Sequence, residues 1–243
     1  MNGRIKLGDC FLQLEPRTLV IAELHLGKPL IRDRKLSEQE IIQTFGRIRS
    51  LINEYNSKEV LILGDVKEQI GLPPKPVQRK IRHGFESILN HTDRVKIIKG
   101  NHDGRIEDFL DIEGISFAYK EERRVGSQKV VLFHGHKFFP VNTYDIAITA
   151  HIHPAANISS DTLAVPIVKT WAIFDLIHQK GEAKWVILPA FSPWITGVSL
   201  NTLPKNDIKR LMPFKGKNEI EIKRLELLYT DLTPLVERSF SLL

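Results

Sequence analysis

Five short apolar runs, each ending abruptly at a polar cluster, constrain the fold of this chain more than any other feature. The first two span residues 18–22 and 60–63, and their aliphatic and β-branched residues are typical of buried strands. Three more runs follow at 95–98, 130–133 and 146–150. Polar side chains of the kinds that bind metal ions come directly after these runs: Glu23, Asp65, Asn101, His102, His134 and His151. Each predicted strand therefore presents such a side chain at its carboxyl end.

Two connections between the predicted strands have helical periodicity. From Ser37 to Asn56 apolar residues recur at helical spacing, and Ser37-Glu38-Gln39-Glu40 is predicted to be a capping box at the helix start. Val77 to Leu89 forms a second amphipathic segment after a proline-rich loop. Alternating strands and helices predict an α/β fold with a parallel sheet, in which ligands gather beyond the carboxyl ends of the strands.

The rest of the chain has a different pattern. Strands are predicted at 164–176, 183–188 and 220–228, separated by turn-rich stretches. We find no internal repeat and no low-complexity linker. We therefore expect residues 1–243 to form a single domain, with the motifs in 18–155, while 156–243 completes a second sheet and a C-terminal tail.

Composition and charge indicate which partners and which location to expect for this protein. The net charge of +6 and the pI near 9.3 favour polyanionic partners. The only cysteine, Cys10, allows no internal disulfide and no thiolate cluster, and we expect it to be buried. No apolar run approaches the ~18 residues of a membrane span, and the start has no secretory signal. We therefore expect a cytoplasmic protein without a membrane partner.

The candidate ligands include two pairs spaced two residues apart, Glu23-x-His25 and His151-x-His153. On extended backbone such pairs point to the same side and can approach one ion. With Asp65, Asn101 and His134 they form a set of oxygen and imidazole donors without sulfur. This set suits manganese, iron, zinc or cobalt better than calcium or a structural zinc site. It is too large for one tetrahedral ion and suits two ions that share a carboxylate.

The order of these residues resembles the calcineurin-like metallophosphoesterases, whose motifs run D-x-H, G-D-x-x, G-N-H-D/E, H-G and G-H-x-H. In this chain they read Glu23-Leu24-His25, Gly64-Asp65, Gly100-Asn101-His102-Asp103, His134-Gly135 and Ala150-His151-Ile152-His153. Within the family the chain is most similar to the SbcD-related branch of small phosphoesterases, to which the stretch 188–191 with Gly197 and Asn201 also corresponds. The resemblance implies a four-layer α/β/β/α sandwich.

The resemblance also implies a ligand set and a reaction. One ion would be held by Glu23, His25, Asp65 and His153, and the other by Asp65, Asn101, His134 and His151. Manganese is favoured, with iron, zinc, cobalt or nickel as alternatives. The two ions would activate a water for in-line attack on phosphorus. His102 would stabilise the transition state or protonate the leaving alkoxide, with Asp103 as its orienting partner.

Two departures from the family pattern stand out. The carboxylate of the first motif is normally aspartate, and Glu23 is one methylene longer, so the first metal site is weaker or differently occupied unless the side chain bends. After Gly64-Asp65 the chain reads Val66-Lys67-Glu68, where histidine or asparagine is expected. Lys67 either contacts a phosphate of the substrate or faces solvent.

Further candidates for substrate binding come from their positions in the chain. His136 either binds phosphate beside His134 or stands in water, and Arg32 belongs to a basic cluster that either borders the site or is a solvated face. We expect Trp171, Trp185 and Trp194 to pack in the core rather than to stack on bases.

These observations favour a metal-dependent phosphodiesterase that acts on nucleic acid, with a role in DNA repair. A phosphodiesterase or phosphomonoesterase of small molecules is the first alternative, since fold and metals determine the phosphoryl chemistry but not the identity of the leaving group. A non-catalytic scaffold with a degenerate site is the second, and Glu23 is the feature that favours it. We expect a homodimer by analogy with similar proteins, and no protein partner is indicated.

Overall fold

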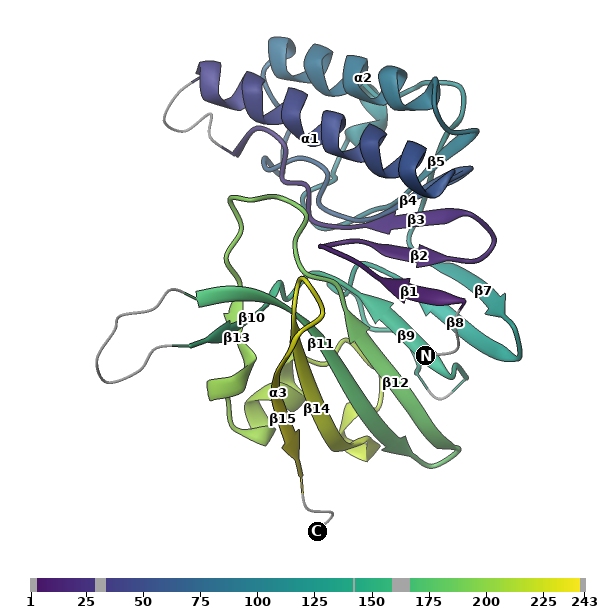
Figure 1. The fold of residues 1–243 in the computed structure, drawn as a ribbon, viewed down its shortest axis with the longest axis vertical. Coiled ribbons are helices and arrows are strands. Elements are labelled where there is room, and N and C mark those ends of the chain that lie inside the picture. Colours follow the sequence, from purple (N-terminus) through teal and green to yellow (C-terminus); the bar gives the residue numbers. More distant parts are fainter. Residues whose placement is uncertain (1–3, 29–33, 142, 159–166, 241–243) are drawn as a thin grey trace.

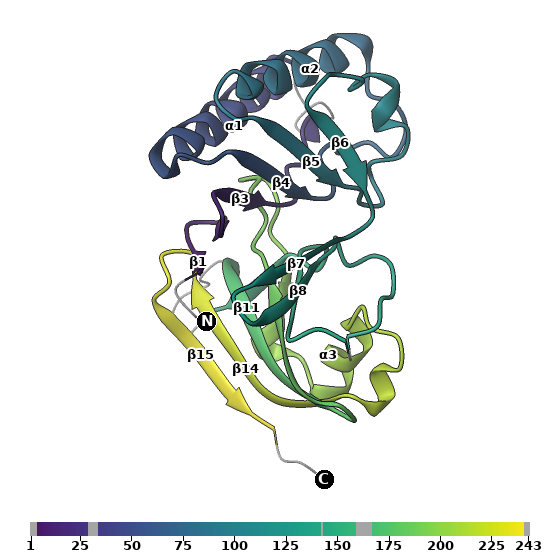
Figure 2. The same ribbon diagram turned by 90° about the vertical axis from the view of Figure 1, so that its right-hand side faces the viewer.

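The computed structural model describes residues 4–28, 34–141, 143–158 and 167–240. Within them the chain forms two β-sheets that lie against each other, with helices on the outside (Figure 1). Helices α1 (Arg34–Tyr55) and α2 (Lys75–Leu89) cover the first sheet. Helix α3 (Lys205–Leu211) lies beside the second sheet, at the other end of the molecule (Figure 2). This layering confirms the predicted α/β/β/α fold class.

The first sheet has the order β1-β2-β3-β4-β5-β6. Its strands are β1 (Ile5–Leu7), β2 (Leu12–Leu14), β3 (Thr18–Ile21), β4 (Glu59–Leu63), β5 (Arg94–Ile98) and β6 (Ile115–Ala118). Strands β3 to β6 run parallel, whereas β1, β2 and β3 are antiparallel. The helical connections impose the parallel pairing, because a crossover returns the chain to the same edge of the sheet. The predicted runs 18–22, 60–63 and 95–98 are β3, β4 and β5.

The second sheet has the order β13-β10-β11-β12-β9-β8-β7, with β14 pairing β11 and β15. Its strands are β7 (Glu121–Val125), β8 (Gln128–Leu132), β9 (Ile146–Thr149), β10 (Pro154–Asn157), β11 (Ile167–His178), β12 (Gly181–Ile187), β13 (Val198–Ser199), β14 (Glu221–Tyr229) and β15 (Pro234–Ser239). Residues after 166 supply β11 to β15 of this sheet. The predicted strand at 164–176 falls on β11, and its first three residues lie outside the described ranges.

Alternation along β3 divides the core into two layers. Leu19 and Ile21 belong to the cluster that α1 and α2 cover, whereas Val20 and Ala22 belong to the cluster between the two sheets. All four side chains are buried. A strand that is apolar on both faces reads as a continuous hydrophobic run, which is how this segment appears in the sequence.

The predicted capping box is wrong. Helix α1 begins at Arg34, so Ser37 is a buried residue inside the helix rather than its N-cap. The Glu40 side chain accepts a hydrogen bond from the backbone amide of Gly27 at 3.2 Å, which ties the helix to the loop that follows β3. Among the described residues, no helix combines the length and the apolar character needed to cross a bilayer.

The tryptophans divide into two kinds. Trp171 and Trp185 are completely buried in the core between the sheets, as expected, and Cys10 is buried too. Trp194 contradicts the expectation of core packing, because it is 52% exposed on the segment between β12 and β13. Its environment is a surface turn, which periodicity alone did not reveal.

Candidate metal centre

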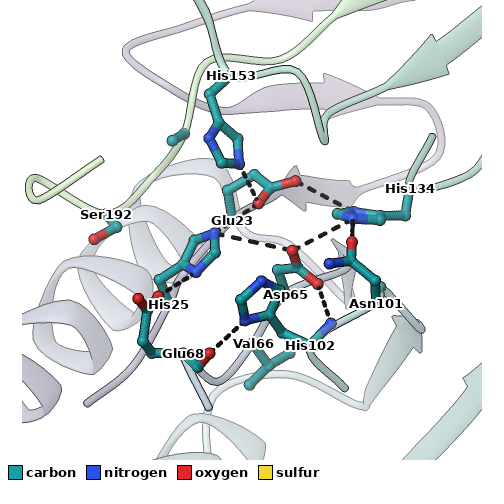
Figure 3. Close-up of polar contacts among 12 residues, drawn as sticks. Glu23, His25, Asp65, Val66, Glu68, Asn101, His102, His134, His153 and Ser192 are labelled. Carbon is teal, nitrogen blue, oxygen red and sulfur yellow. Dashed lines mark hydrogen bonds and ion pairs between the residues drawn. The ribbon is translucent and has the colours of Figure 1, made fainter. Parts of the chain in front are cut away.

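The candidate ligands converge where the carboxyl ends of strands from both sheets meet (Figure 3). Glu23 and His25 follow β3, Asp65 follows β4, and Asn101 follows β5. The second sheet contributes His134 after β8 and the pair His151 and His153 between β9 and β10. Packing of the two sheets therefore brings together residues that lie far apart in the chain.

The first donor group consists of Glu23, His25 and His153, whose donor atoms lie within 4.8 Å of one another. Oε2 of Glu23 lies 2.9 Å from Nε2 of His25 and 2.7 Å from Nε2 of His153. The extra methylene of Glu23 thus lets one oxygen reach both imidazoles.

The second donor group consists of Asp65, His134 and His151, with Asn101 beside it. Nε2 of His134 lies 3.4 Å from Oδ2 of Asp65 and 3.1 Å from Oδ1 of Asn101. Nδ1 of His134 lies 3.0 Å from the carbonyl oxygen of Leu63 and donates to it, which leaves Nε2 to face the other donors.

Asp65 lies between the two groups. Its Oδ2 is 4.0 Å from Nε2 of His25 in the first group and 3.4 Å from Nε2 of His134 in the second. Its Oδ1 accepts a hydrogen bond from the backbone amide of His102 at 2.9 Å, which fixes the carboxylate. This is the position that a carboxylate shared by two ions requires.

Left-handed backbone is concentrated at the candidate ligands. A positive φ occurs at Glu23 (57°), His25 (46°), Asp65 (49°), His151 (24°) and His153 (50°). Residues other than glycine rarely adopt such angles, each at a cost of about 1–3 kcal/mol, and they cluster at functional sites. The fold thus maintains strain at the residues predicted to bind metal.

Two glycines of the motifs are required by close approach. A Cβ at Gly100 would lie 2.0 Å from Oδ1 of Asp65. A Cβ at Gly64, where φ is 77°, would lie 2.3 Å from Nδ1 of His134. Larger residues here would displace two of the candidate ligands, which explains why glycine precedes Asp65 and Asn101.

The electrostatics of the centre suit cations. Burial would raise the pKa of Glu23, but His134, His153 and His25 outweigh it and hold the pKa well below its usual range. Burial likewise opposes the charge on His134, yet Glu23 and Asp65 raise its pKa to about 9. Oε1 of Glu23 is buried and lies 3.2 Å from Nδ1 of His134, but it has no hydrogen-bond partner among the described residues. An ionised, incompletely satisfied carboxylate among imidazoles fits a divalent ion, so the donors present fit the predicted pair of metals.

His102 is held differently from the expectation. Its Nδ1 contacts the backbone carbonyl of Glu68, so Glu68 rather than Asp103 orients the ring. The buried Asp103 carboxylate instead accepts hydrogen bonds from the amides of Val66 and Gly100, both at 2.9 Å. Asp103 therefore joins the loops after β4 and β5 and does not touch the His102 ring. The orienting role assigned to Asp103 was wrong.

Glu68 is a residue of the centre that the sequence analysis missed. Its Oε2 lies 2.7 Å from Nδ1 of His25, and its Oε1 lies 3.4 Å from the Lys28 ammonium. The Glu68 carboxylate thus fixes the His25 ring with Nε2 turned toward Glu23. The irregular second motif was the available signal, since it puts an acid three residues after Asp65.

The position of Lys67 argues against both expectations for this residue. Lys67 is completely buried, and its ammonium donates to the carbonyls of Gln69, Ile70, Gly71 and His102. All of these acceptors belong to the two loops that flank the centre. Lys67 therefore holds the loops together instead of reaching substrate or solvent.

The remaining substrate-binding candidates have different outcomes. The His136 ring lies 5.1 Å from the His134 ring and 6.2 Å from the His151 ring, centroid to centroid. Burial, with the charges of His134 and His151, lowers the pKa of His136 to about 4. His136 is thus a neutral imidazole beside the second donor group, and its contact with substrate stays a prediction. Arg32 lies outside the described residues.

A segment that we call the strap, residues 190–199, connects the two sheets at the centre. It is the green loop that rises from β12 toward α1 before it returns to β13 (Figure 1). The amide of Ser192 donates to the carbonyl of Glu23 at 3.1 Å, and that of Val198 donates to the carbonyl of His153 at 3.0 Å. The strap therefore holds the backbones of two residues in the first donor group.

The cationic side chains of Lys169 and Arg47 bind the backbone of the strap. The Lys169 ammonium donates to the carbonyls of Ala190, at 3.1 Å, and of Ser192. Arg47 of α1 donates to the carbonyl of Phe191 at 3.4 Å, and its guanidinium lies 4.1 Å from the centre of the Phe191 ring. Three consecutive carbonyls are thus bound by cations from two other elements.

The chain is similar to known proteins in sequence profile and in fold. The family profile of the calcineurin-like phosphoesterases matches residues 16–217. The solved structure of the Pseudomonas putida nuclease MPE is similar, with a TM-score of 0.62 and 19% identity over 94% of this chain and 93% of that one. Yfce, a phosphoesterase from E. coli, gives 0.45 and 14% over 92% and 99% of the two chains. No curated protein sequence matches the chain. The chain belongs to the calcineurin-like phosphoesterases.

Proposed function

We propose that this protein hydrolyses phosphodiester bonds of nucleic acid at a centre that holds two divalent metal ions. The observation that carries the proposal is the position of Asp65, whose Oδ2 lies within 4.0 Å of His25 and 3.4 Å of His134. A shared carboxylate between two donor groups is the arrangement that two-metal phosphoryl transfer uses.

The chain's own residues have separate tasks in this proposal. Glu23, His25 and His153 hold one ion, Asn101, His134 and His151 hold the other, and Asp65 joins them. When bound, such a pair of ions lowers the pKa of a water and neutralises charge on the phosphoryl oxygens. Manganese is the expected metal, since the donors are oxygen and imidazole.

In this proposal His102 acts on the leaving group. The contact of its Nδ1 with the Glu68 carbonyl leaves Nε2 as the atom able to give a proton to the departing oxygen. The His102 ring lies 5.2 Å from that of His25, centroid to centroid, so the ring is close to the first donor group. Asp65 fixes the backbone of the same residue through the His102 amide.

Two observations favour nucleic acid as the substrate. The net charge of +6 attracts a polyanion. The similar structure from Pseudomonas putida is that of a nuclease. A role in DNA repair and a cytoplasmic location accompany this proposal as predictions.

The experiment is hydrolysis by metal-stripped protein reloaded with manganese, measured on single-stranded DNA and on bis-p-nitrophenyl phosphate. We expect turnover of both substrates to require the metal. His102→Ala should lose activity at least a hundredfold while it still binds manganese. The affinity for DNA should fall steeply as the salt concentration rises, and the affinity for the small diester should fall little.

Rapid turnover of small diesters with none of DNA would favour a small-molecule phosphodiesterase. Metal binding without any turnover would favour a scaffold.

A further inference from the structure

Trp194 lies on the strap between its two attachments to the centre. Ser192 is bonded to the backbone of Glu23, and Val198 to the backbone of His153. These two bonds attach both ends of the turn 193–197 to residues of the first donor group, whose side-chain atoms Oε2 of Glu23 and Nε2 of His153 lie 2.7 Å apart, so the turn lies at the rim of that group. Trp194 thus follows two residues after a group that contacts the centre.

The turn holds Trp194 in place although the side chain is exposed. On either side of it Ser192 and Ile195 are buried, and the Trp194 amide lies 3.3 Å from the Ser192 hydroxyl, to which it donates. Behind the turn, Lys169 and Arg47 bind the strap carbonyls. The backbone that carries the indole is therefore fixed, whereas 52% of its surface is open.

An exposed indole on a fixed backbone is suited to stacking. A planar aromatic side chain loses little conformational freedom when a nucleobase stacks on it, and every base has a face to offer. The other two tryptophans show that the core of this chain accommodates indole rings completely. Exposure of Trp194 is therefore a property of its position at the rim and not of crowding in the interior.

We propose that Trp194 is a stacking platform for an unpaired nucleobase of the substrate strand, next to the phosphodiester bound at the first donor group. This inference rests on the proposed nuclease function and adds to it the kind of strand. A base inside a duplex is already stacked on both faces, so a platform at the rim selects single strands or frayed ends.

Intrinsic fluorescence tests the platform directly, because the chain has three tryptophans and two of them are fully buried. The protein is the manganese-loaded His102→Ala variant, in which turnover does not consume the ligand. It is titrated with a labelled oligothymidylate and with an abasic strand of the same length, and fluorescence anisotropy of the label measures binding separately. We expect the oligothymidylate to quench tryptophan emission and the abasic strand to leave it unchanged.

Variants at Trp194 give the second readout. Trp194→Ala should weaken oligothymidylate binding about tenfold or more, with abolished quenching, and Trp194→Phe should restore most of the affinity. Tyr55→Ala is the matched control, since Tyr55 is a 40% exposed aromatic residue at the far end of α1. It should change neither readout.

Failure of this inference is distinct from failure of the nuclease proposal. Tight oligothymidylate binding with unchanged emission, and equal affinity of Trp194→Ala, would show that no base stacks on Trp194. Absence of binding by the parent protein at low salt would instead overturn the nucleic-acid function and the platform with it.

Discussion

Oε2 of Glu23 and Nε2 of His153 lie 2.7 Å apart, and this contact joins the two sheets at the candidate metal centre. Glu23 follows β3 of the first sheet, and His153 directly precedes β10 of the second. The first donor group therefore exists only while the sheets are packed together. An ion bound there favours the folded state, because the unfolded chain has no such site.

Removal of metal should therefore destabilise the protein. At manganese concentrations a hundredfold above the dissociation constant, the folded state gains about 2.7 kcal/mol per site. We expect thermal unfolding of protein treated with chelator to occur several degrees lower than that of reloaded protein. His153→Ala should show a smaller difference because it lacks one donor. An equal unfolding temperature with and without manganese would contradict binding at this centre.

Glu23→Asp tests whether the longer side chain fits the centre. Aspartate would withdraw the carboxylate by about one bond length, so one oxygen would no longer reach both His25 and His153. We expect the first ion to bind about tenfold more weakly, with little change at the second. Calorimetric titration with manganese measures both sites, and His151→Ala identifies the second. Tighter binding by the aspartate variant would mean that glutamate weakens the site.

Lys169→Met should weaken the same ion from a distance. Loss of the ammonium leaves the carbonyls of Ala190 and Ser192 without this donor and loosens the strap that holds Glu23. Loss of a supporting partner commonly costs 10–100-fold in metal affinity, and we expect about tenfold at the first site only. Lys169→Arg should retain most of the affinity.

Lys217→Met is the matched control for that experiment, because Lys217 also donates to a backbone carbonyl, that of Arg210 at 2.7 Å, which belongs to α3 and not to the strap. It should leave manganese binding unchanged. Equal weakening of both sites in Lys169→Met would indicate a general loss of structure and contradict a specific effect on Glu23.

Glu40 makes stability depend on pH. Burial raises the pKa of its carboxyl from 4.5 to about 7, with a further increase from Glu68, against the opposing effects of the Gly27 amide and His25. The unfolded chain thus loses this proton at lower pH than the folded chain. Stability should fall as pH rises from 4.5 through 7 and then level off, by about 3 kcal/mol in all.

Glu40→Gln removes that dependence because it cannot ionise. We expect its free energy of unfolding in urea, relative to that of the parent protein, to be larger at pH 8 than at pH 5 by up to about 3 kcal/mol. Glu38→Gln, two residues earlier on α1 and partly exposed, is the control. The same difference between variant and parent protein at both pH values would refute the assignment.

Sequence alone determined the strand ends and the ligands that follow them. The runs before Glu23 and Asp65 are recognisable because each is continuously apolar, as a strand buried on both faces must be, whereas Lys96 interrupts the run before Asn101. The expectation that His151 and His153 approach one ion from extended backbone was wrong, because both have a left-handed φ and they belong to different donor groups. The strand runs and the amphipathic face of α2 were recognisable from the chain alone. These features depend on neighbours in the chain, which a pattern can reveal.

Tertiary structure decided what surrounds and supports those ligands. Glu68 orients His25, Asp103 joins two loops, Lys169 binds the strap and Trp194 is left exposed at the rim. None of these roles follows from periodicity, because each depends on a partner that only the packing of two sheets brings near. A charged or aromatic side chain has no intrinsic preference for one such role, and the contacts available in three dimensions select it.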